Sequence, residues 1–335
     1  MQYTTLGRTG LRVSRLCLGT MNFGPETSEP DSHAIMSHAL DLGINFWDTA
    51  DVYGWKRGES WTESIIGRWF AANPGKRDQV VLATKFYNEM GPGPNDRGNS
   101  AYHLRHAVEK SLKALQTDRL DLYQMHHIDR AASWDEIWDA YDALIKQGKI
   151  VYAGSSNFAG WHLAKANEAA RRKHLLGLVS EQCKFSLQCR HAELEIIPAA
   201  RDYGLAVIPW SPLASGMLAG IHQPGKRRNS DWVKPSLAAN MPKLEKWEAF
   251  CQSLGQSPAD VALAWTLHVP GVTAPIIGPR TLEQLTATLR ALDLSLSPES
   301  LANLDTIWPP AGHPDIQKPD NKNPHKYASP EAFAW

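Results

Sequence analysis

Short apolar segments recur along the chain, and most of them end at a polar or glycine-containing group. Within each segment the hydrophobic, often β-branched residues are nearly continuous, which is typical of strands buried on both faces of a sheet. The segments span residues 15–22, 44–50, 80–86, 120–127, 150–158, 177–182, 205–212 and 273–280. We therefore expect these segments to be the strands of one parallel sheet.

Segments of helical period lie between the predicted strands, and the clearest are residues 100–115, 133–149 and 257–268. Their apolar faces consist, respectively, of Leu104, Val108, Leu112 and Leu115, of Ile137, Tyr141, Leu144 and Ile145, and of Val261, Ala264, Trp265 and His268. A Ser133/Glu136 capping box predicts the start of the second helix, and Ser257 followed by Pro258 predicts the start of the third. Strand and helix alternate throughout.

This alternation predicts an α/β fold in which crossover helices cover a parallel sheet. The number of strand–helix units fits a closed (β/α)8 TIM barrel better than an open doubly wound sheet, which has about six strands. Residues 2–14, with a GRTG turn, predict a β-hairpin that plugs one end of the barrel. Residues 308–335 are rich in proline and predict an irregular C-terminal tail. We expect one barrel domain over residues 1–335.

Composition narrows the class of protein. Hydrophobic residues make up 43% and charged residues 21%, as in a globular protein with a large core. The 35 basic and 35 acidic side chains cancel, which argues against nucleic acid or an anionic membrane as the partner. No signal peptide or membrane span is visible, so we expect a cytosolic protein. The cysteines, Cys17, Cys183, Cys189 and Cys251, lack metal-ligand spacing, and we expect no metal site.

Polar side chains follow the predicted strands at the points where the strands end. In barrels of this type the active site forms at the carboxyl ends of the strands, so these side chains should converge. Asp48 and Tyr53 follow the second strand, Lys85 the third, and His126 with His127 the fourth. Later strands end at Ser156, Asn157, Gln182, Trp210, Gly278 and Arg280.

Tyr53, Lys85, Asp48 and a histidine can act as one chemical unit. A phenol has a pKa of about 10, too high for efficient proton transfer near neutral pH, and a nearby ammonium lowers it. The carboxylate of Asp48 would hold the ammonium of Lys85 in place, and the imidazole would direct a substrate oxygen toward the phenol. Such a unit suits the reduction of carbonyl groups. Lys85 alone would equally suit a Schiff-base enzyme.

The chain resembles the aldo-keto reductases, of the type that includes bacterial enzymes and potassium-channel β subunits. The resemblance rests on LGTMNFG, DTADVYG, TKF, DLYQMHHID, GSSNF, EQCKFSLQCR, PWSPLASGML and IIGPRTLEQL, which occur in the order usual for the family. It implies a catalytic tetrad of Asp48, Tyr53, Lys85 and His126, with Tyr53 as the general acid. The implied reaction is the NADPH-dependent reduction of an aldehyde or ketone to an alcohol.

The same resemblance implies a cofactor site. Ser156, Asn157 and Gln182 would bind the nicotinamide carboxamide, Trp210 would stack on the ring, and the loop from Ser211 to Gly216 would carry the pyrophosphate. The full set of implied cofactor residues is Thr20, Met21, Ser156, Asn157, Gln182, Trp210, Ser211, Pro212, Leu213, Ser215, Gly216, Gly278, Arg280 and Gln284. Arg280 and the start of the following helix suit a 2′-phosphate, which favours NADPH over NADH.

Two features differ from a plain family member. Thr288 stands where the family commonly has an adenine-contacting Asn, so we expect a looser hold on the adenine. The loop over residues 222–234 is long and basic, and Lys226, Arg227 or Arg228 could close over the pyrophosphate. Thr281 with Gln284 also fits a capping box that any helix could use.

Around the predicted tetrad, Trp55, Tyr87 and His127 are candidates for substrate contact. Adjacent residues of a strand point to opposite faces, so His126 and His127 should not bind one metal ion together. We expect Asp51 to be a turn or helix-capping carboxylate. Two other functions stay open: a cofactor-bound regulatory or sensor subunit with little turnover, and a Schiff-base aldolase that uses Lys85.

Overall fold

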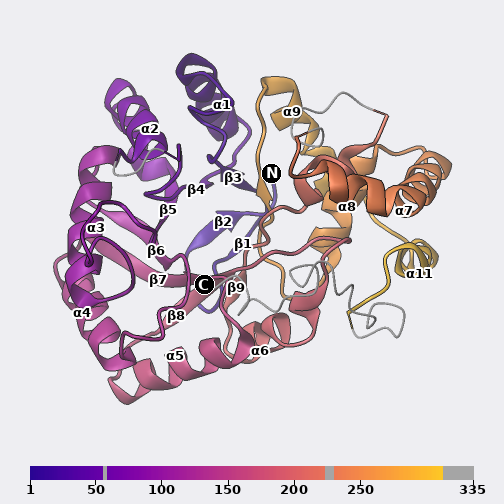
Figure 1. Ribbon diagram of the computed structural model, residues 1–335. Helices are drawn as coiled ribbons and strands as arrows, with labels where there is room; N and C mark the ends of the chain where they lie inside the picture. The colour runs from indigo at the N-terminus through magenta and orange to yellow at the C-terminus, as the bar shows by residue number, and fades with distance from the viewer. Residues whose placement is uncertain (56–58, 223–229, 312–335) are drawn as a thin grey trace.

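The computed structural model describes residues 1–55, 59–222 and 230–311, and its centre is a parallel sheet with the strand order β10-β3-β4-β5-β6-β7-β8-β9 (Figure 1). The strands are β3 (Cys17–Gly19), β4 (Phe46–Asp48), β5 (Val81–Phe86), β6 (Leu120–Met125), β7 (Ile150–Ser156), β8 (Leu178–Gln182), β9 (Ala206–Val207) and β10 (Ile276–Ile277). Each predicted apolar segment contains one of these strands. The regular strands are shorter than the segments, most of all at β9 and β10.

The two outer strands of this order join, which closes the sheet. The backbone N–H of Thr273 donates to the carbonyl of Val207 over 2.8 Å, and that of Ile276 donates to Pro209 over 2.8 Å. Val207 and Val272 also form a parallel bridge. The predicted (β/α)8 barrel is therefore confirmed.

Helices surround the barrel on its outside (Figure 1). They are α1 (Glu29–Asp41), α2 (Trp61–Ala72), α3 (Ala101–Leu115), α4 (Trp134–Lys146), α5 (Gly160–Arg172), α6 (Ile196–Asp202), α7 (Lys234–Ser253), α8 (Pro258–His268), α9 (Leu282–Ala287), α10 (Arg290–Asp293) and α11 (Pro298–Ile307). Three short 3-10 helices, η1 (Arg77–Gln79), η2 (His191–Glu193) and η3 (Ala214–Ala219), complete the set for the described residues. No helix in this described part is both long and apolar enough to cross a membrane.

Strand side chains alternate between two cores, which explains why the strands read as continuous apolar runs. Phe46 belongs to the cluster inside the barrel, whereas its neighbour Trp47 belongs to the larger cluster between the strands and the helices. The hairpin of β1 (Tyr3–Thr5) and β2 (Arg12–Ser14) contributes Leu6 and Val13 to the inner cluster. The predicted hairpin plug is therefore confirmed.

The predicted helices form, with corrections in detail. The four leucine and valine positions expected to face inward on α3 are buried, and Ser100 caps this helix by accepting from the N–H of His103. Ser133 likewise caps α4, but the Glu136 carboxylate accepts from the N–H of Ala101 at the start of α3. The predicted capping box is therefore only half formed, because Glu136 satisfies a neighbouring helix instead of its own.

Two side chains predicted to face the core are exposed. Ile145 of α4 is 41% exposed, because it lies at the edge of the stripe that Ile137, Tyr141 and Leu144 bury. In α8, which Ser257 caps as predicted, the whole run Asp260–Thr266 is buried and His268 is exposed at the C-terminal end. α8 is therefore enclosed on all sides and not amphipathic. Most of the predicted tail, residues 312–335, lies outside the described residues.

Candidate active site

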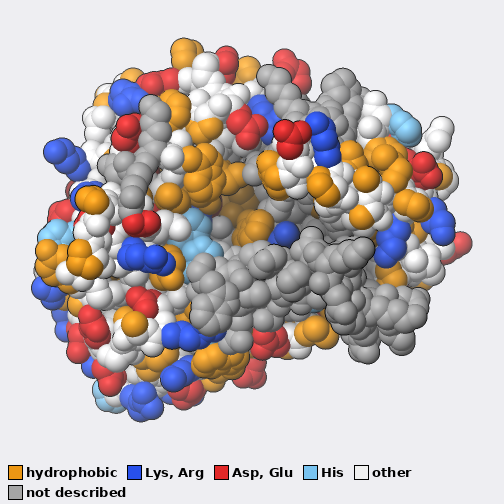
Figure 2. Space-filling view, viewed as in Figure 1, with side chains coloured by type: hydrophobic (Ala, Val, Ile, Leu, Met, Phe, Trp, Pro, Cys, Tyr) orange, Lys and Arg blue, Asp and Glu red, His pale blue; other side chains and the backbone are white. Residues whose placement is uncertain are grey.

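The four predicted tetrad residues meet at the carboxyl ends of neighbouring strands. Asp48 is the last residue of β4, Lys85 is the next-to-last residue of β5, and His126 directly follows β6. Tyr53 lies in the turn between β4 and α2. The face of the molecule shown in Figure 2 is hollowed near its centre, with hydrophobic side chains in the hollow and histidines at its edge.

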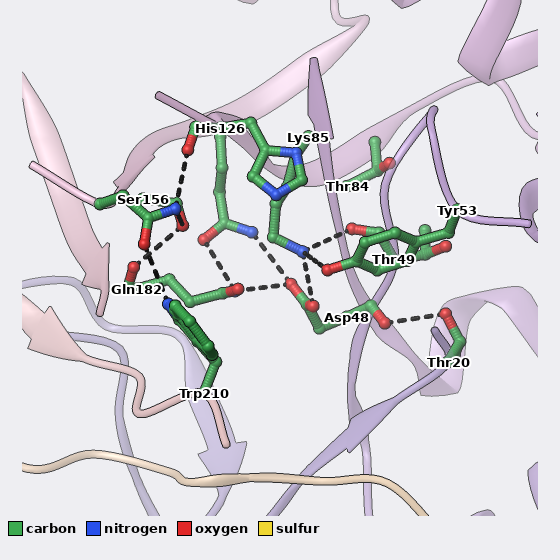
Figure 3. A network of polar contacts seen from close by, with 12 residues as sticks. Thr20, Asp48, Thr49, Tyr53, Thr84, Lys85, His126, Ser156, Gln182 and Trp210 are labelled. Atoms are coloured by element: carbon green, nitrogen blue, oxygen red, sulfur yellow. Dashed lines mark hydrogen bonds and ion pairs between the residues drawn. The ribbon is translucent and has the colours of Figure 1, made fainter. Parts of the chain in front are cut away.

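Lys85 is the centre of the polar network in Figure 3. Its Nζ atom, fully buried, donates to Asp48 Oδ2 over 2.6 Å, to the Thr49 carbonyl over 2.8 Å and to Tyr53 Oη over 3.1 Å. An ammonium has three protons, and these acceptors take all of them. The phenolic oxygen of Tyr53 therefore accepts from Lys85, which leaves its own O–H to donate elsewhere.

Both carboxylate oxygens of Asp48 accept hydrogen bonds. Oδ2 accepts from Lys85, while Oδ1 accepts from Gln124 Nε2 over 3.1 Å and from Gln182 Nε2 over 2.8 Å. The Thr20 hydroxyl donates to the Asp48 carbonyl over 2.9 Å. Sequence reasoning missed Gln124, although a glutamine inside an otherwise apolar strand is a signal that a buried partner exists.

Burial, and not Lys85, decides the pKa of Tyr53. Burial raises the pKa of the phenol above 10.0, and the lowering effect of the Lys85 ammonium is smaller. The expected lowering by the Lys85 ammonium is present, but burial outweighs it, because the phenol is only 9% exposed and loses the solvation that a phenolate needs. Tyr53 is consequently a protonated phenol near neutral pH, which is the form that can donate a proton.

Lys85 stays charged despite its burial. Burial lowers its pKa, but the neighbouring Asp48 and Tyr53 outweigh that effect, so the pKa of Lys85 is raised above 10.5. A Schiff-base lysine attacks as the neutral amine. The charge and the complete set of acceptors therefore argue against that chemistry at Lys85.

His126 lies beside Tyr53 with its ring edge-on, at 6.1 Å between ring centroids. Its backbone N–H donates to the Phe86 carbonyl, and its carbonyl accepts from Asn157 Nδ2. Burial, together with the charge of Lys85, holds the pKa of His126 well below 6.5. The imidazole is therefore neutral near neutral pH. Its Nδ1 atom lies 3.0 Å from Asn88 Nδ2, a contact that sequence reasoning missed.

His127 does not point away from His126. The two rings are stacked at 5.1 Å with an angle of 8° between their planes, and burial lowers the pKa of His127 to about 4. The expected opposite orientation is wrong because β6 ends at Met125, so the alternation of strand side chains no longer applies. No group of metal-binding side chains with suitable spacing occurs in the described residues.

Two aromatic side chains predicted to contact substrate flank the tetrad. The Trp55 ring is 6.0 Å from the ring of Tyr53, and the Tyr87 ring is 5.3 Å from that of His127. Trp55 is 63% exposed, which places it at the outer edge of the site. Both residues have positive φ angles, 58° for Trp55 and 146° for Tyr87, which residues other than glycine seldom adopt.

One of the two structural roles expected for Asp51 is confirmed. It lies in a turn as predicted, but the N-cap of α2 is Ser60, and Asp51 itself is only 2% exposed. Burial and the adjacent carboxyl of Glu63 raise the pKa of Asp51 well above 3.8, and burial raises that of Glu63 to about 7. The Thr84 hydroxyl donates to Glu63 Oε1 over 2.6 Å. The two acids form a buried pair behind the site.

The residues predicted to hold a nicotinamide group lie together beside the tetrad (Figure 3). The Ser156 hydroxyl donates to the Gln182 carbonyl over 2.9 Å, and Trp210 Nε1 donates to Asn157 Oδ1 over 3.0 Å. Asn157 Nδ2 also donates to Ser156 Oγ over 3.1 Å. These bonds fix the side chains in one orientation at the rim, adjacent to Asp48.

The loop predicted to carry a pyrophosphate has an unusual backbone. Ser211, Ala214, Ser215 and Gly216 all have positive φ angles, and the Ser215 N–H donates to Ser211 Oγ over 3.2 Å. The N–H groups of Ala214 and Gly216 also donate within the loop, to the carbonyls of Ser211 and Leu213, both over 2.9 Å. The basic loop positions 226–228, predicted to close over the pyrophosphate, lie outside the described residues.

Arg280, predicted to bind a 2′-phosphate, is paired with Glu26 at 2.8 Å, and its Nε is buried without a hydrogen-bond partner in the described part of the chain. Thr281 caps α9 as expected, but Gln284 Oε1 accepts from the N–H of Arg280, one residue before the cap. The Thr288 hydroxyl donates to the Leu285 carbonyl of its own helix. Because α9 has only six residues, the guanidinium of Arg280, and not the start of this helix, is the main group that would attract an anion here.

A (β/α)8 barrel with Tyr, Lys, Asp and His joined at its carboxyl-terminal rim defines a class of oxidoreductases, and comparison with known proteins agrees. The model of the aldo/keto reductase family matches residues 15–309. The chain is 51% identical to the uncharacterized oxidoreductase YrpG of Bacillus subtilis, over 100% of both chains. The chain therefore belongs to the aldo/keto reductase family.

More distant relatives have different printed functions. The chain is 34% identical to the norsolorinic acid reductase stcV of Emericella nidulans, over 90% of this chain and 79% of that protein. It is 32% identical to a probable voltage-gated potassium channel subunit beta of Oryza sativa subsp. japonica, over 92% of this chain and 96% of that protein. The family thus includes both reductases and a channel subunit at similar identity.

Proposed function

We propose that this protein reduces an aldehyde or ketone to an alcohol with NADPH, with Tyr53 as the proton donor. The observation that carries the proposal is the hydrogen-bond set of Lys85. It fixes a charged ammonium against the oxygen of a protonated phenol, so the phenolic O–H is free to donate. An acid in this arrangement can supply a proton to a carbonyl oxygen as negative charge develops on it.

The residues of the rim fit a nicotinamide dinucleotide phosphate. The orphaned Nε of Arg280 suits a phosphate oxygen, and the loop from Ser211 to Gly216 would carry the pyrophosphate. Ser156, Asn157, Gln182 and Trp210 would hold the nicotinamide end, with Thr20, Met21 and Gly278 near it, and Pro212, Leu213 and Gln284 would line the remaining length. When bound, NADPH supplies the hydride that reduces the carbonyl carbon.

The protein's own groups then act on the carbonyl oxygen. His126, as a neutral imidazole, donates a hydrogen bond that orients this oxygen toward Tyr53. The Tyr53 phenol transfers its proton to the oxygen, and the Lys85 ammonium stabilises the phenolate that remains. Asp48 keeps Lys85 in place and charged. The substrate gains one hydride and one proton, and bulk solvent restores the proton of Tyr53.

Trp55, Tyr87 and His127 would contact the substrate beyond its reacting carbonyl. Their rings lie next to Tyr53, His127 and His126, respectively, so they border the position where the carbonyl must sit. A small-molecule carbonyl compound is the proposed partner. The cytosol is the proposed location, on the basis of the sequence prediction.

The potassium-channel relative supports a second candidate, a cofactor-bound regulatory subunit with little turnover. The two functions separate in a steady-state assay of NADPH oxidation with a panel of aldehydes and ketones. Turnover that depends on the carbonyl compound supports the reductase. Tight NADPH binding without turnover across the panel supports the regulatory subunit and contradicts our proposal. A Schiff-base enzyme would instead form a borohydride-trapped adduct on Lys85.

A further inference from the structure

Asn88 lies in the loop after β5, three residues beyond Lys85, and its side chain reaches His126, which directly follows β6. Its amide nitrogen Nδ2 is 3.0 Å from Nδ1 of His126. Asn88 is itself only half-buried, whereas the polar side chains around Lys85 are buried. This contact therefore joins the reaction side of the site to a loop at its edge.

The chemistry of the two groups bears on which ring nitrogen of His126 carries the proton. An amide NH2 only donates hydrogen bonds, so the Nδ1 atom that faces it must accept. A neutral imidazole carries one proton, and with Nδ1 as the acceptor this proton is on Nε2. Within residues 1–55, 59–222 and 230–311, the titratable groups that contact His126 or shift its pKa are Tyr53, Lys85 and His127, and none of them is a carboxylate that would favour a second proton.

We propose that Asn88 is a positioning residue that holds His126 in the tautomer with the proton on Nε2, so that this N–H points to the substrate oxygen. This inference rests on the proposed carbonyl reduction and adds to it a residue that does not touch the reacting atoms. The partner of one ring nitrogen of a histidine generally decides which nitrogen carries the proton.

The opposite tautomer would oppose the reaction in two ways. A bare Nε2 would present a lone pair to the substrate oxygen and repel it. The same lone pair would compete for the proton of Tyr53, whose ring lies edge-on to His126. A single amide therefore separates an imidazole that assists the transfer of the proton from one that intercepts it.

The sharpest test replaces Asn88 by Asp. The shape is kept, but a carboxylate only accepts hydrogen bonds, so Nδ1 of His126 must carry a proton in N88D. The Nε2 proton is then present only in the doubly protonated ring. We expect kcat of N88D to fall by about tenfold or more at alkaline pH and to recover toward acid pH, as general acid–base assistance is regained. The wild-type profile should lack this ionisation.

Two controls separate positioning from general damage. Asn303→Asp makes the same chemical change on an exposed position of α11 and should leave kcat and its pH profile unchanged. NADPH affinity of N88D should stay within about twofold of wild type, because a positioning effect on the proton moves kcat and not ground-state binding. A pH profile of N88D that matches that of the wild type overturns the proposal.

The tautomer can also be measured without turnover. The 15N chemical shifts of a histidine distinguish a protonated ring nitrogen from a bare one, and His126→Asn identifies the signals of this residue among the 13 histidines. We expect Nε2 to be protonated in the wild type and Nδ1 to become protonated in N88D. A wild-type His126 with its proton on Nδ1 overturns the inference. Because no substrate is involved, this result stands apart from any failure of the proposed reduction.

Discussion

The Nζ atom of Lys85 lies 2.6 Å from Oδ2 of Asp48, across two neighbouring strands and with both side chains buried. Each charge depends on the other, since neither has bulk water to solvate it. A buried ion pair of this kind adds little net stability compared with an apolar pair of the same size. Removal of one partner, however, leaves the other charge buried and unpaired. Function, and not stability, therefore explains why the protein has this pair. Mutation of each partner separately can measure its contribution.

Lys85→Met should lower the free energy of unfolding by about 3–5 kcal/mol, because it leaves the Asp48 carboxylate buried and unpaired. Adding Asp48→Asn removes the unpaired charge. The double variant should therefore regain part of the lost free energy of unfolding while remaining inactive. Urea unfolding of the two single variants and the double variant measures the coupling. Strictly additive losses of stability would contradict the mutual dependence of the two charges.

Glu26→Gln should strengthen NADPH binding relative to NADH binding. In the structure the Glu26 carboxylate forms an ion pair with the guanidinium of Arg280. It would therefore compete with a 2′-phosphate for that guanidinium. The gain in NADPH affinity should be about two- to fivefold, the size expected for a partly exposed ion pair. Fluorescence titration with both cofactors measures the ratio.

The matched control is Glu29→Gln at the start of α1, which breaks the ion pair of Glu29 with Arg68 of α2. It should leave both affinities unchanged. Equal changes in NADPH and NADH affinity on Glu26→Gln would show that Arg280 does not meet the 2′-phosphate.

Glu63→Gln should flatten the pH dependence of stability between pH 4.5 and pH 7. The pKa of Glu63 is raised by burial from 4.5 to about 7, so the unfolded chain loses its proton first. As the pH rises through this window, ionisation of the unfolded chain favours unfolding, and the folded protein loses stability. The full loss is about 3 kcal/mol for a shift of this size.

Glutamine keeps an oxygen that can accept from the Thr84 hydroxyl but has no proton to lose in this range. The free energy of unfolding of the variant should therefore fall less than that of the wild type over the window. Urea unfolding at a series of pH values compares the two. Parallel curves would mean that Glu63 is not protonated in the folded protein near pH 6.

The sequence predicted the barrel and the tetrad because both depend on local features. Apolar strand segments and polar residues at their ends repeat along the chain, and their order carries the resemblance to the family. Contacts made only by closure of the barrel were not visible. Gln124 and Gln182 come from different strands to share Asp48, and Asn88 reaches His126 across two loops.

The predictions that were wrong or incomplete also depended on contacts that form only in the folded protein. The stacking of His127 on His126 depends on where β6 ends, and strand ends are poorly defined by an apolar pattern. The net pKa of Tyr53 depends on how far burial outweighs one nearby charge, which spacing along the chain cannot reveal. Glu136 bonds to α3 because two helices lie side by side in the folded protein.

The most direct test of the account is the substitution Tyr53→Phe, followed by separate measurement of cofactor binding and turnover. The phenylalanine ring keeps the packing but removes the O–H. NADPH affinity from tryptophan fluorescence should stay within about twofold of wild type, while kcat with a good aldehyde falls by about 10²- to 10⁴-fold. Tyr102→Phe, at a position 60% exposed, is the matched control. Wild-type turnover in Tyr53→Phe would contradict the proposed role of Tyr53.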